Sequence, residues 1–372
     1  MNLKIKKDLL LEGLNKVSKA LSVKSLVPVL QGIKFDLTKK GLTLTASDND
    51  ITIEVFIESN DDMTIEKEGS IIIQGKYILD IVRKLPDEYI NIEVIDELKI
   101  TVYTDNSEFN LNGINKNEYP NINLDLSKNP ITIDSKVFRN IINQTSFAAS
   151  SDESRPVLTG INFKINGDII ECNSTDSYRL ARKLINNSDT VEDNYNIVIP
   201  SKNLLEFTKI MSDDDSVELH IFNNKILIKN DNILFQSRLI SGTYPNTANL
   251  LPDEFVLNIN VNVNDLYNVI DRASILTSDK EKNIVTFEIS GDKLFVRSNS
   301  AEIGRVEEKM LIKKDNDENL KISFVGKYMM DALRSFEDDE VTISFVGEVK
   351  PIILKSKNDE GLTQLVLPIR TY

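Results

Sequence analysis

The chain of 372 residues is 41% hydrophobic and carries 58 acidic against 44 basic side chains, a net charge of −14. No apolar run approaches the ~20 residues that a membrane-spanning helix needs, and the single cysteine, Cys172, excludes an internal disulfide. The averaged field repels nucleic acid and anionic membranes unless the charges are sorted by location. Because the first twenty residues lack the continuous apolar core of a signal peptide, we expect a soluble cytoplasmic protein.

Helices and strands alternate along the chain. Apolar residues recur at helical spacing in KKDLLLEGLNKVSKAL, and they alternate with polar residues in KGLTLTAS and GDKLFVRS, as in half-buried strands. The pattern therefore predicts an α+β protein. Six helices are predicted, at residues 4–19, 76–85, 135–147, 201–211, 263–276 and 326–336.

The sequence repeats itself three times. PVLQGIKFDL begins at Pro28 and PVLTGINFKI at Pro156, an offset of 128, and a weaker third copy is NIVTFEISGD. In this alignment Phe35, Phe163 and Phe287 correspond. A repeat of this length indicates one structural unit per copy. We predict domains at residues 1–125, 126–250 and 251–372, with linkers near 121–129 and 246–254.

Positive charge is concentrated in the predicted helices. They hold 15 basic and 7 acidic residues, whereas the remainder holds 29 basic and 51 acidic residues. The second helix of each repeat carries a cation, an acid and a cation at the same spacing, as in Lys76, Asp80 and Arg83. One such face is explained by solvated ion pairs. Three faces in the same register indicate a surface that meets one polyanion.

Helix dimensions limit what such a surface can surround. Six helices of ~10 Å diameter, placed side by side, leave a hole of only ~10 Å, whereas twelve leave nearly ~30 Å. Since a B-DNA duplex is roughly 20 Å wide, one chain cannot encircle it and two can. The hypothesis is a head-to-tail ring with helices inside. We predict that these helical cations face the DNA: Lys76, Arg83, Lys84, Arg139, Lys202, Lys209, Arg272, Lys327 and Arg334.

Several motifs resemble one known family. The threefold repeat, TDSYRLA, YPNTANLLP, VGKYMMDAL and the C-terminal QLVLPIRTY are together similar to bacterial DNA polymerase III β subunits, the sliding clamps. The resemblance implies three clamp domains, each with two helices packed on antiparallel sheets, and a homodimeric ring that encircles duplex DNA without sequence readout. It also implies three classes of protein partner: the replicative polymerase's catalytic subunit, the clamp loader and other proteins with short clamp-binding motifs.

The resemblance assigns roles to particular residues. It places Lys24 and Arg155 near the duplex. It places the strand around Phe109 and Leu111 of one subunit against Ile275 and Leu276 of the other. It implies a pocket for partner peptides formed by Leu158, Thr175, Tyr178, Arg179, Leu180, Pro245, Leu250, Tyr328, Val349, Pro351, Leu365, Val366, Leu367, Pro368, Ile369 and Arg370.

Residues for catalysis and metal binding are scarce. The only histidine, His220, is predicted to be a solvated strand residue, so neither a His-based triad nor a His-rich metal site can be assembled. GSIIIQGKY fails the phosphate-loop spacing. We therefore expect a protein that is not an enzyme and has no cofactor. A carboxylate-pair hydrolase and an extracellular adhesion protein remain alternatives.

Overall fold

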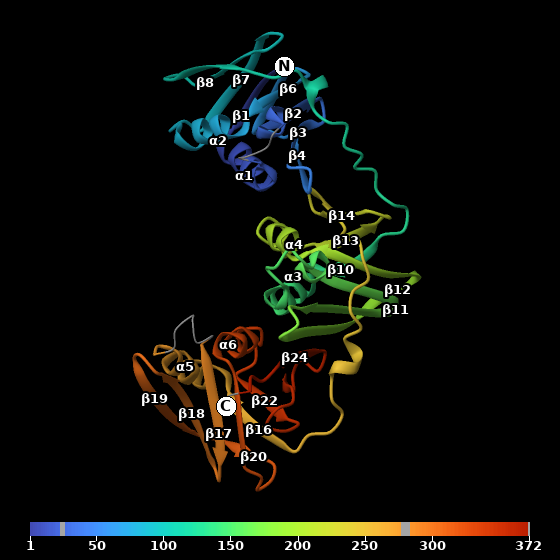
Figure 1. The fold of residues 1–372 in the computed structure, drawn as a ribbon. Helices are drawn as coiled ribbons and strands as arrows, with labels where there is room; N and C mark the ends of the chain where they lie inside the picture. Colours follow the sequence, from blue (N-terminus) through green and yellow to red (C-terminus); the bar gives the residue numbers. More distant parts are fainter. Residues whose placement is uncertain (23–26, 277–282, 371–372) are drawn as a thin grey trace. The chain divides into compact units, whose positions relative to one another are not determined.

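The computed structural model describes residues 1–22, 27–276 and 283–370 (Figure 1). The chain forms two compact units, one of Met1–Phe138 with Asn203–Leu239 and one of Arg139–Lys202 with Ile240–Tyr372. Each unit contains two antiparallel sheets. Within the described residues, no helix is both long and apolar enough to cross a membrane.

The first unit holds a five-stranded and an eight-stranded sheet. The five-stranded sheet has the order β5 (Met63–Lys67), β1 (Asn2–Lys6), β7 (Tyr89–Asp96), β8 (Lys99–Tyr103), β9 (Glu108–Asn112). The eight-stranded sheet has the order β10 (Ile131–Asp134), β13 (Ser216–Ile221), β14 (Lys225–Asn230), β15 (Ile233–Arg238), β4 (Ile51–Glu58), β3 (Gly41–Ser47), β2 (Gly32–Thr38), β6 (Gly69–Gln74).

The second unit holds a seven-stranded and a four-stranded sheet. The seven-stranded sheet has the order β11 (Gly160–Thr175), β12 (Arg179–Pro200), β24 (Leu362–Val366), β23 (Ile352–Lys355), β22 (Glu340–Phe345), β16 (Leu257–Asn262), β20 (Lys313–Lys314). The four-stranded sheet has the order β19 (Gly304–Leu311), β18 (Lys293–Ser300), β17 (Ile284–Ser290), β21 (Leu320–Val325).

The helices lie close to their predicted positions; five of them are shorter than predicted, and α2 keeps its predicted length but begins one residue earlier. They are α1 (Lys7–Val17), α2 (Gly75–Lys84), α3 (Ser135–Thr145), α4 (Ser201–Thr208), α5 (Val263–Ser274) and α6 (Gly326–Arg334). The start at residue 4 is wrong, because Asn2–Lys6 is strand β1, paired with β5 and β7. Strands β10 and β16 likewise precede α3 and α5. Each repeat therefore opens with a strand that the sequence reading missed.

Small residues begin the second helix of each repeat. A Cβ on Gly75 would lie 2.4 Å from Leu21 Cδ1, and one on Gly326 would lie 2.8 Å from Ser274 Oγ. In the middle repeat Ser201 takes this place, and its hydroxyl donates to the carbonyl of Ser146 at 3.2 Å. The start of each second helix thus lies close to the end of the first helix or to the residues that follow it. The repeated phenylalanines Phe35, Phe163 and Phe287 are all fully buried, which confirms them as core positions.

Sheets continue across the repeat boundaries. Strand β4 of the first repeat pairs with β15 of the second, and β12 of the second pairs with β24 of the third. Since each half of the middle repeat shares a sheet with a neighbouring repeat, the two compact units divide that repeat between them. The equivalents of these joining strands at the two ends of the chain are β9 and β19, and both are edge strands of their sheets.

The structure revises the charge count and the reading of His220. The six helices of the described ranges hold 11 basic and 7 acidic residues, because Lys4, Lys6, Lys19 and Lys209 lie outside the observed helices. His220 is buried rather than solvated, since Ser127 of the linker predicted near residues 121–129 covers it and contacts Nδ1 through its N–H at 3.1 Å and its hydroxyl at 2.9 Å. Burial lowers the pKa of His220, and Glu218 opposes this shift.

Candidate functional site

A tight turn between β11 and β12 presents Tyr178 to solvent. The Thr175 hydroxyl donates to the carbonyl of Arg179 at 2.6 Å, and Asp176 Oδ1 accepts from the N–H groups of Tyr178 and Arg179 at 2.9 and 3.0 Å. Ser177 adopts a φ of 78°, a conformation that few non-glycine residues take. These bonds fix the turn and leave the Tyr178 side chain 61% exposed.

The guanidinium of Arg179 is held on several sides. Its Nε lies 2.9 Å from Asp176, and a terminal nitrogen lies 2.7 Å from Asp331 of α6. The same guanidinium lies over the rings of Tyr328 and Phe147, with 4.6 and 5.4 Å to the centroids. Charge pairing and cation–π contacts together fix one orientation of the planar group.

Two tyrosines form an aromatic surface beside this arginine. The rings of Tyr178 and Tyr328 are stacked, with 6.4 Å between centroids and 24° between planes. Burial and the nearby Asp176 carboxylate raise the pKa of Tyr328, whereas Arg179 lowers it. Tyr328 is therefore a neutral hydrogen-bond donor near pH 7.

The C-terminal strand forms the adjoining wall. Leu180 pairs with Leu365 and Arg179 with Val366 across β12 and β24. Leu180 and Leu365 are buried in a cluster against which Leu367 packs. Beyond the strand, the Leu367 N–H donates to the carbonyl of Tyr178 at 2.9 Å. The segment after β24 thus follows the Tyr178 turn.

Exposed apolar residues complete the candidate peptide site. Leu250 is 49% and Val349 59% exposed, and Pro245 is also exposed. Pro245 follows Tyr244, whose buried hydroxyl accepts from the Thr175 N–H at 3.0 Å and whose ring packs on Leu158. Pro351 precedes β23, the neighbour of β24. Of the remaining predicted residues, Pro368 and Ile369 are half-buried and Arg370 is exposed.

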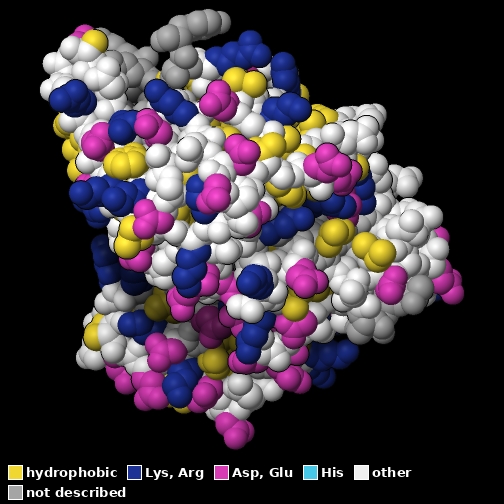
Figure 2. All heavy atoms as spheres, turned by 90° about the horizontal axis from the view of Figure 1, so that it is seen from below, with side chains coloured by type: hydrophobic (Ala, Val, Ile, Leu, Met, Phe, Trp, Pro, Cys, Tyr) yellow, Lys and Arg dark blue, Asp and Glu magenta, His cyan; other side chains and the backbone are white. Residues whose placement is uncertain are grey.

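Most of the predicted DNA-facing cations are exposed. Lys76, Lys202 and Lys327 each occupy the second position of their helix, as the repeat predicts. Five more of the predicted cations are exposed: Arg83, Lys84, Arg155, Lys209 and Arg334. Arg139 is half-buried. Lys24 lies outside the described residues. Figure 2 shows basic and acidic side chains interspersed over the visible face, so charge there is not of one sign.

Two of these cations have strong intramolecular partners. Arg272 contacts Glu308 through two nitrogens, at 3.1 and 2.9 Å, and this hydrogen-bonded pair lowers the pKa of Glu308. Arg334 donates to the hydroxyl of Tyr267 and lies over its ring, 4.6 Å from the centroid. A phosphate would have to compete with Glu308 for Arg272. Arg272 is therefore a poorer candidate than Lys76 or Lys327.

The residues predicted for subunit contact lie at two separate places. Phe109 and Leu111 are on the edge strand β9, where Phe109 is 37% exposed. Ile275 and Leu276 directly follow α5, and Ile275 is 71% exposed. Their exposure leaves both places accessible for the subunit contact that the family resemblance implies.

Comparison with known proteins shows the family of the chain. Family models of the DNA polymerase III beta subunit match residues 1–123 (N-terminal domain), 132–246 (central domain) and 248–370 (C-terminal domain). The chain belongs to the DNA polymerase III beta subunit family. The beta sliding clamps of Bacillus subtilis and Staphylococcus epidermidis are each 39% identical to it over the full length of both chains.

Solved structures of the beta subunit family agree. The crystal structure of the Bacillus subtilis DNA polymerase sliding clamp has a TM-score of 0.96, with 39% identity and full coverage of both chains. The beta subunit from the DNA polymerase of Streptococcus pyogenes also has a TM-score of 0.96, at 32% identity and full coverage. The expected clamp fold of three repeated domains is thereby confirmed. The exact domain boundaries stay a prediction.

Sequence reasoning missed three residues that support the candidate site. Asp331 is the acid between Lys327 and Arg334 in the repeated cation–acid–cation spacing, yet its carboxylate pairs with Arg179. Phe147 and Tyr244 were not predicted as site residues, although Phe147 contacts Arg179 and Tyr244 contacts the Thr175 N–H. A signal for Tyr244 did exist, because Tyr119-Pro120 and Tyr244-Pro245 occupy equivalent places in two repeats. Nothing in the sequence indicated that Asp331 and Arg179 meet.

We expect Arg179→Gln to lower the free energy of unfolding by about 2–4 kcal/mol, because it leaves two partly buried carboxylates without their cation. Urea unfolding followed by fluorescence or circular dichroism would measure the change. Arg297→Gln is the matched control: Arg297 also meets two carboxylates, Glu288 and Glu307, but is more exposed. Its removal should cost less than about 1 kcal/mol. An equal decrease in the free energy of unfolding in both variants would contradict the role of burial.

Proposed function

We propose that two copies of this chain close head to tail into a ring around duplex DNA, and that the ring tethers the replicative polymerase and other partners without catalysing a reaction. Membership of the beta subunit family supports this role. The observation that carries the ring is the pattern of strand pairing between repeats.

Strand pairing supports head-to-tail closure. Within the chain, β4 joins β15 and β12 joins β24, so in both cases the first half of one repeat pairs with the second half of the next repeat. By this rule β19 of the third repeat should pair with β9 of the first repeat in another copy. Unpaired edge strands readily accept another strand. Phe109 on β9 and Ile275 beyond α5 provide apolar side chains for that joint.

The helical cations suit contact with DNA that slides. Lys76, Lys202 and Lys327 are long, exposed side chains at helix starts, and they carry charge without a rigid base-reading geometry. Contacts to phosphates bind without sequence preference and are screened by salt. Retention on DNA would then come from closure of the ring rather than from tight contact.

The Tyr178 turn suits a short peptide of a partner. Stacked tyrosines, exposed Leu250 and Val349, and buried leucines beneath them favour an apolar anchor such as leucine or phenylalanine. The Tyr328 hydroxyl and backbone groups of the C-terminal segment offer polar contacts for a residue such as glutamine. The clamp loader and the polymerase catalytic subunit are the proposed partners.

Topological retention tests the proposal directly. The protein, loaded on a nicked circular plasmid, should remain bound through gel filtration in moderate salt, and cutting the plasmid once should release it. The Phe109→Glu variant should leave circles as fast as linear DNA, since a charge on β9 opposes the subunit joint. Its native mass should fall from that of two 42.1 kDa chains toward that of one.

A matched substitution distinguishes loss of the proposed subunit contact from a general defect in folding. Phe56 has the same 37% exposure as Phe109, but its strand β4 has partners on both sides in the eight-stranded sheet. Phe56→Glu should therefore keep the dimer and its retention on circles. Equal retention of the unmodified protein on circular and linear DNA would rule out the ring.

A further inference from the structure

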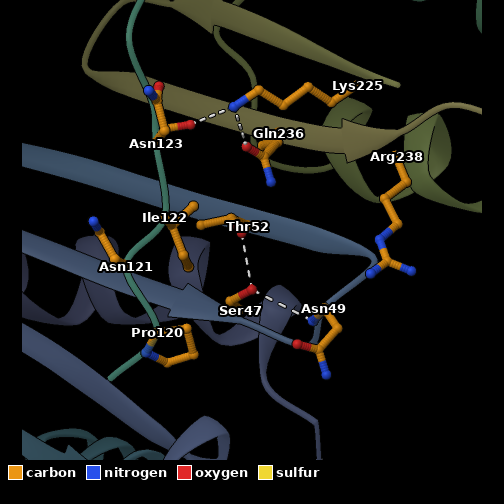
Figure 3. A pocket seen from close by; sticks show the side chains of 10 residues that line it. All are labelled: Ser47, Asn49, Thr52, Pro120, Asn121, Ile122, Asn123, Lys225, Gln236 and Arg238. Carbon is orange, nitrogen blue, oxygen red and sulfur yellow. Dashed lines mark hydrogen bonds between the residues drawn. The ribbon is translucent and has the colours of Figure 1, made fainter. Parts of the chain in front are cut away.

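A second, polar cavity lies in the first unit, away from the Tyr178 turn (Figure 3). Its volume is about 260 Å³. The β3–β4 turn, the linker at residues 120–123 and the strands β14 and β15 form its walls. Lys225 and Arg238 supply positive charge, and Asn121 and Gln236 supply amide groups.

The turn beside this cavity repeats the Tyr178 turn bond for bond. The Ser47 hydroxyl donates to the carbonyl of Ile51 at 3.1 Å, as Thr175 does to Arg179. Asp48 Oδ1 accepts from the N–H groups of Asp50 and Ile51 at 2.9 and 2.8 Å. Asn49 has a φ of 77°, and Ser177 has one of 78°. The cavity is therefore the first-repeat equivalent of the candidate peptide site.

The wall strands are equivalent as well. Gln236 pairs with Thr52 on β4 in the way that Leu365 pairs with Leu180 on β12. The Arg238 N–H donates to the carbonyl of Asp50 at 3.1 Å, as the Leu367 N–H does to that of Tyr178. By this register Gln236 and Arg238 replace Leu365 and Leu367. The position of Pro351 is taken by Lys225, which faces Arg238 across β14 and β15.

These replacements change the chemistry from apolar to cationic. Lys225 donates to the Asn123 carbonyl and to Gln236 Oε1, the latter at 3.1 Å, so its charge is anchored beside the linker. The Arg238 side chain is 65% exposed and lies 3.8 Å from the similarly exposed carboxylate of Asp50. An exposed pair at this distance is weak, so an incoming carboxylate can replace Asp50 at low energetic cost.

We propose that this cavity binds an extended peptide segment carrying an acidic side chain, with its carboxylate between Arg238 and Lys225. The amides of Asn49, Asn121 and Gln236 provide donors and acceptors for the backbone of such a segment. The site is distinct from the Tyr178 turn. The protein would then have two peptide sites, one for a segment with an apolar anchor and one for a segment with an acidic side chain.

Size and setting favour a peptide over other anions. The cavity is smaller than the roughly 300–1,000 Å³ of pockets for drug-sized ligands, so it suits one or two side chains rather than a nucleotide. Amides beside the cations match a peptide backbone. Ile122, which lines the cavity, packs on the apolar cluster of Val29, Leu30, Ile72 and Tyr119, so the linker forms a fixed wall.

The test uses the full-length protein and two fluorescein-labelled nonapeptides, one of alternating Glu and Ser and one of alternating Gln and Ser. Fluorescence anisotropy at low salt should show tighter binding of the Glu peptide, and Arg238→Gln should weaken it by about threefold to tenfold. Lys357→Gln removes the same charge from an exposed lysine in the other unit and should change nothing. Hydrogen exchange should show protection of residues 119–124 by the Glu peptide.

Each alternative has its own outcome. Tyr178→Ala should leave Glu-peptide binding intact, so failure of the proposed partner site would not be mistaken for failure of this one. Equal affinity for the two peptides, or no effect of Arg238→Gln, would overturn the proposal. So would equal protection of residues 119–124 by inorganic phosphate alone, which would indicate a free anion. Tighter binding of a single-stranded oligothymidine at the same residues would instead indicate nucleic acid.

Discussion

A chain that lacks residues 367–372 is expected to bind leucine-containing partner peptides about 30-fold more weakly or worse. The deletion removes the Leu367 side chain from the cluster of Leu180 and Leu365, and it removes the hydrogen bond from Leu367 to Tyr178. It also removes the hydrogen bond from the Ile369 N–H to the Ser323 carbonyl, 2.7 Å long. Fluorescence anisotropy with a labelled peptide of the polymerase measures the decrease in affinity.

A point substitution tests whether the deletion acts through loss of the Leu367 side chain or through a defect in folding. Leu367→Ser should weaken the same peptide by about tenfold, because the hydroxyl cannot replace the buried apolar contact. Leu98→Ser is its matched control, since Leu98 is a 42% exposed leucine of the first unit. Native mass should remain that of the proposed dimer in all three variants. Unchanged peptide affinity in the deletion variant would remove the C-terminal segment from the site.

Sequence periodicity was informative where burial follows a simple repeat. The phenylalanines Phe35, Phe163 and Phe287 and the lysines at the second position of three helices lie where the repeat predicts them. The edges of elements were less predictable. Lys4 and Lys6 read as part of a cationic helix, but they alternate with the buried Leu3 and Ile5, and this alternation belongs to strand β1.

Contacts between repeats could not be predicted from a single sequence. The pairing of β4 with β15 depends on strands more than 170 residues apart, and no local pattern encodes it. The same holds for Asp331 and Arg179, and for Ser127 over His220. His220 appeared solvated because its strand alternates, yet both faces of that strand are covered, one of them by a linker. Long-range burial of this kind is a property of the fold.

One turn geometry therefore serves two different surfaces. The bonds around Ser47 and Thr175 are the same, and the difference lies in what the next strand presents: Gln236 and Arg238 at one site, Leu365 and Leu367 at the other. A repeated scaffold fixes where a ligand segment can lie, and a few side chains set its chemistry.

The double variant Arg83→Glu with Lys209→Glu is expected to lose most of its salt-sensitive affinity for DNA while keeping its fold. Both side chains are 54% exposed and pair with nearby acids, Arg83 with Asp80 at 3.8 Å and Lys209 with Glu206 at 2.7 Å. Two copies would bring four reversed charges to the duplex. The slope of log K against log salt should fall in magnitude by about 0.9 for each phosphate that the variant no longer neutralises.

The variant Lys39→Glu with Lys40→Glu changes the net charge by the same amount on exposed residues of the β2–β3 turn. If the helices meet the DNA, this control should retain the salt slope of the unmodified protein, and only the helical variant should load poorly on nicked circles. A lower urea midpoint in the helical variant than in the control would show that its DNA-binding defect comes from a loss of stability. Equal slopes would show that overall charge, rather than the helix faces, governs DNA binding, and the assignment of Arg83 and Lys209 would be wrong.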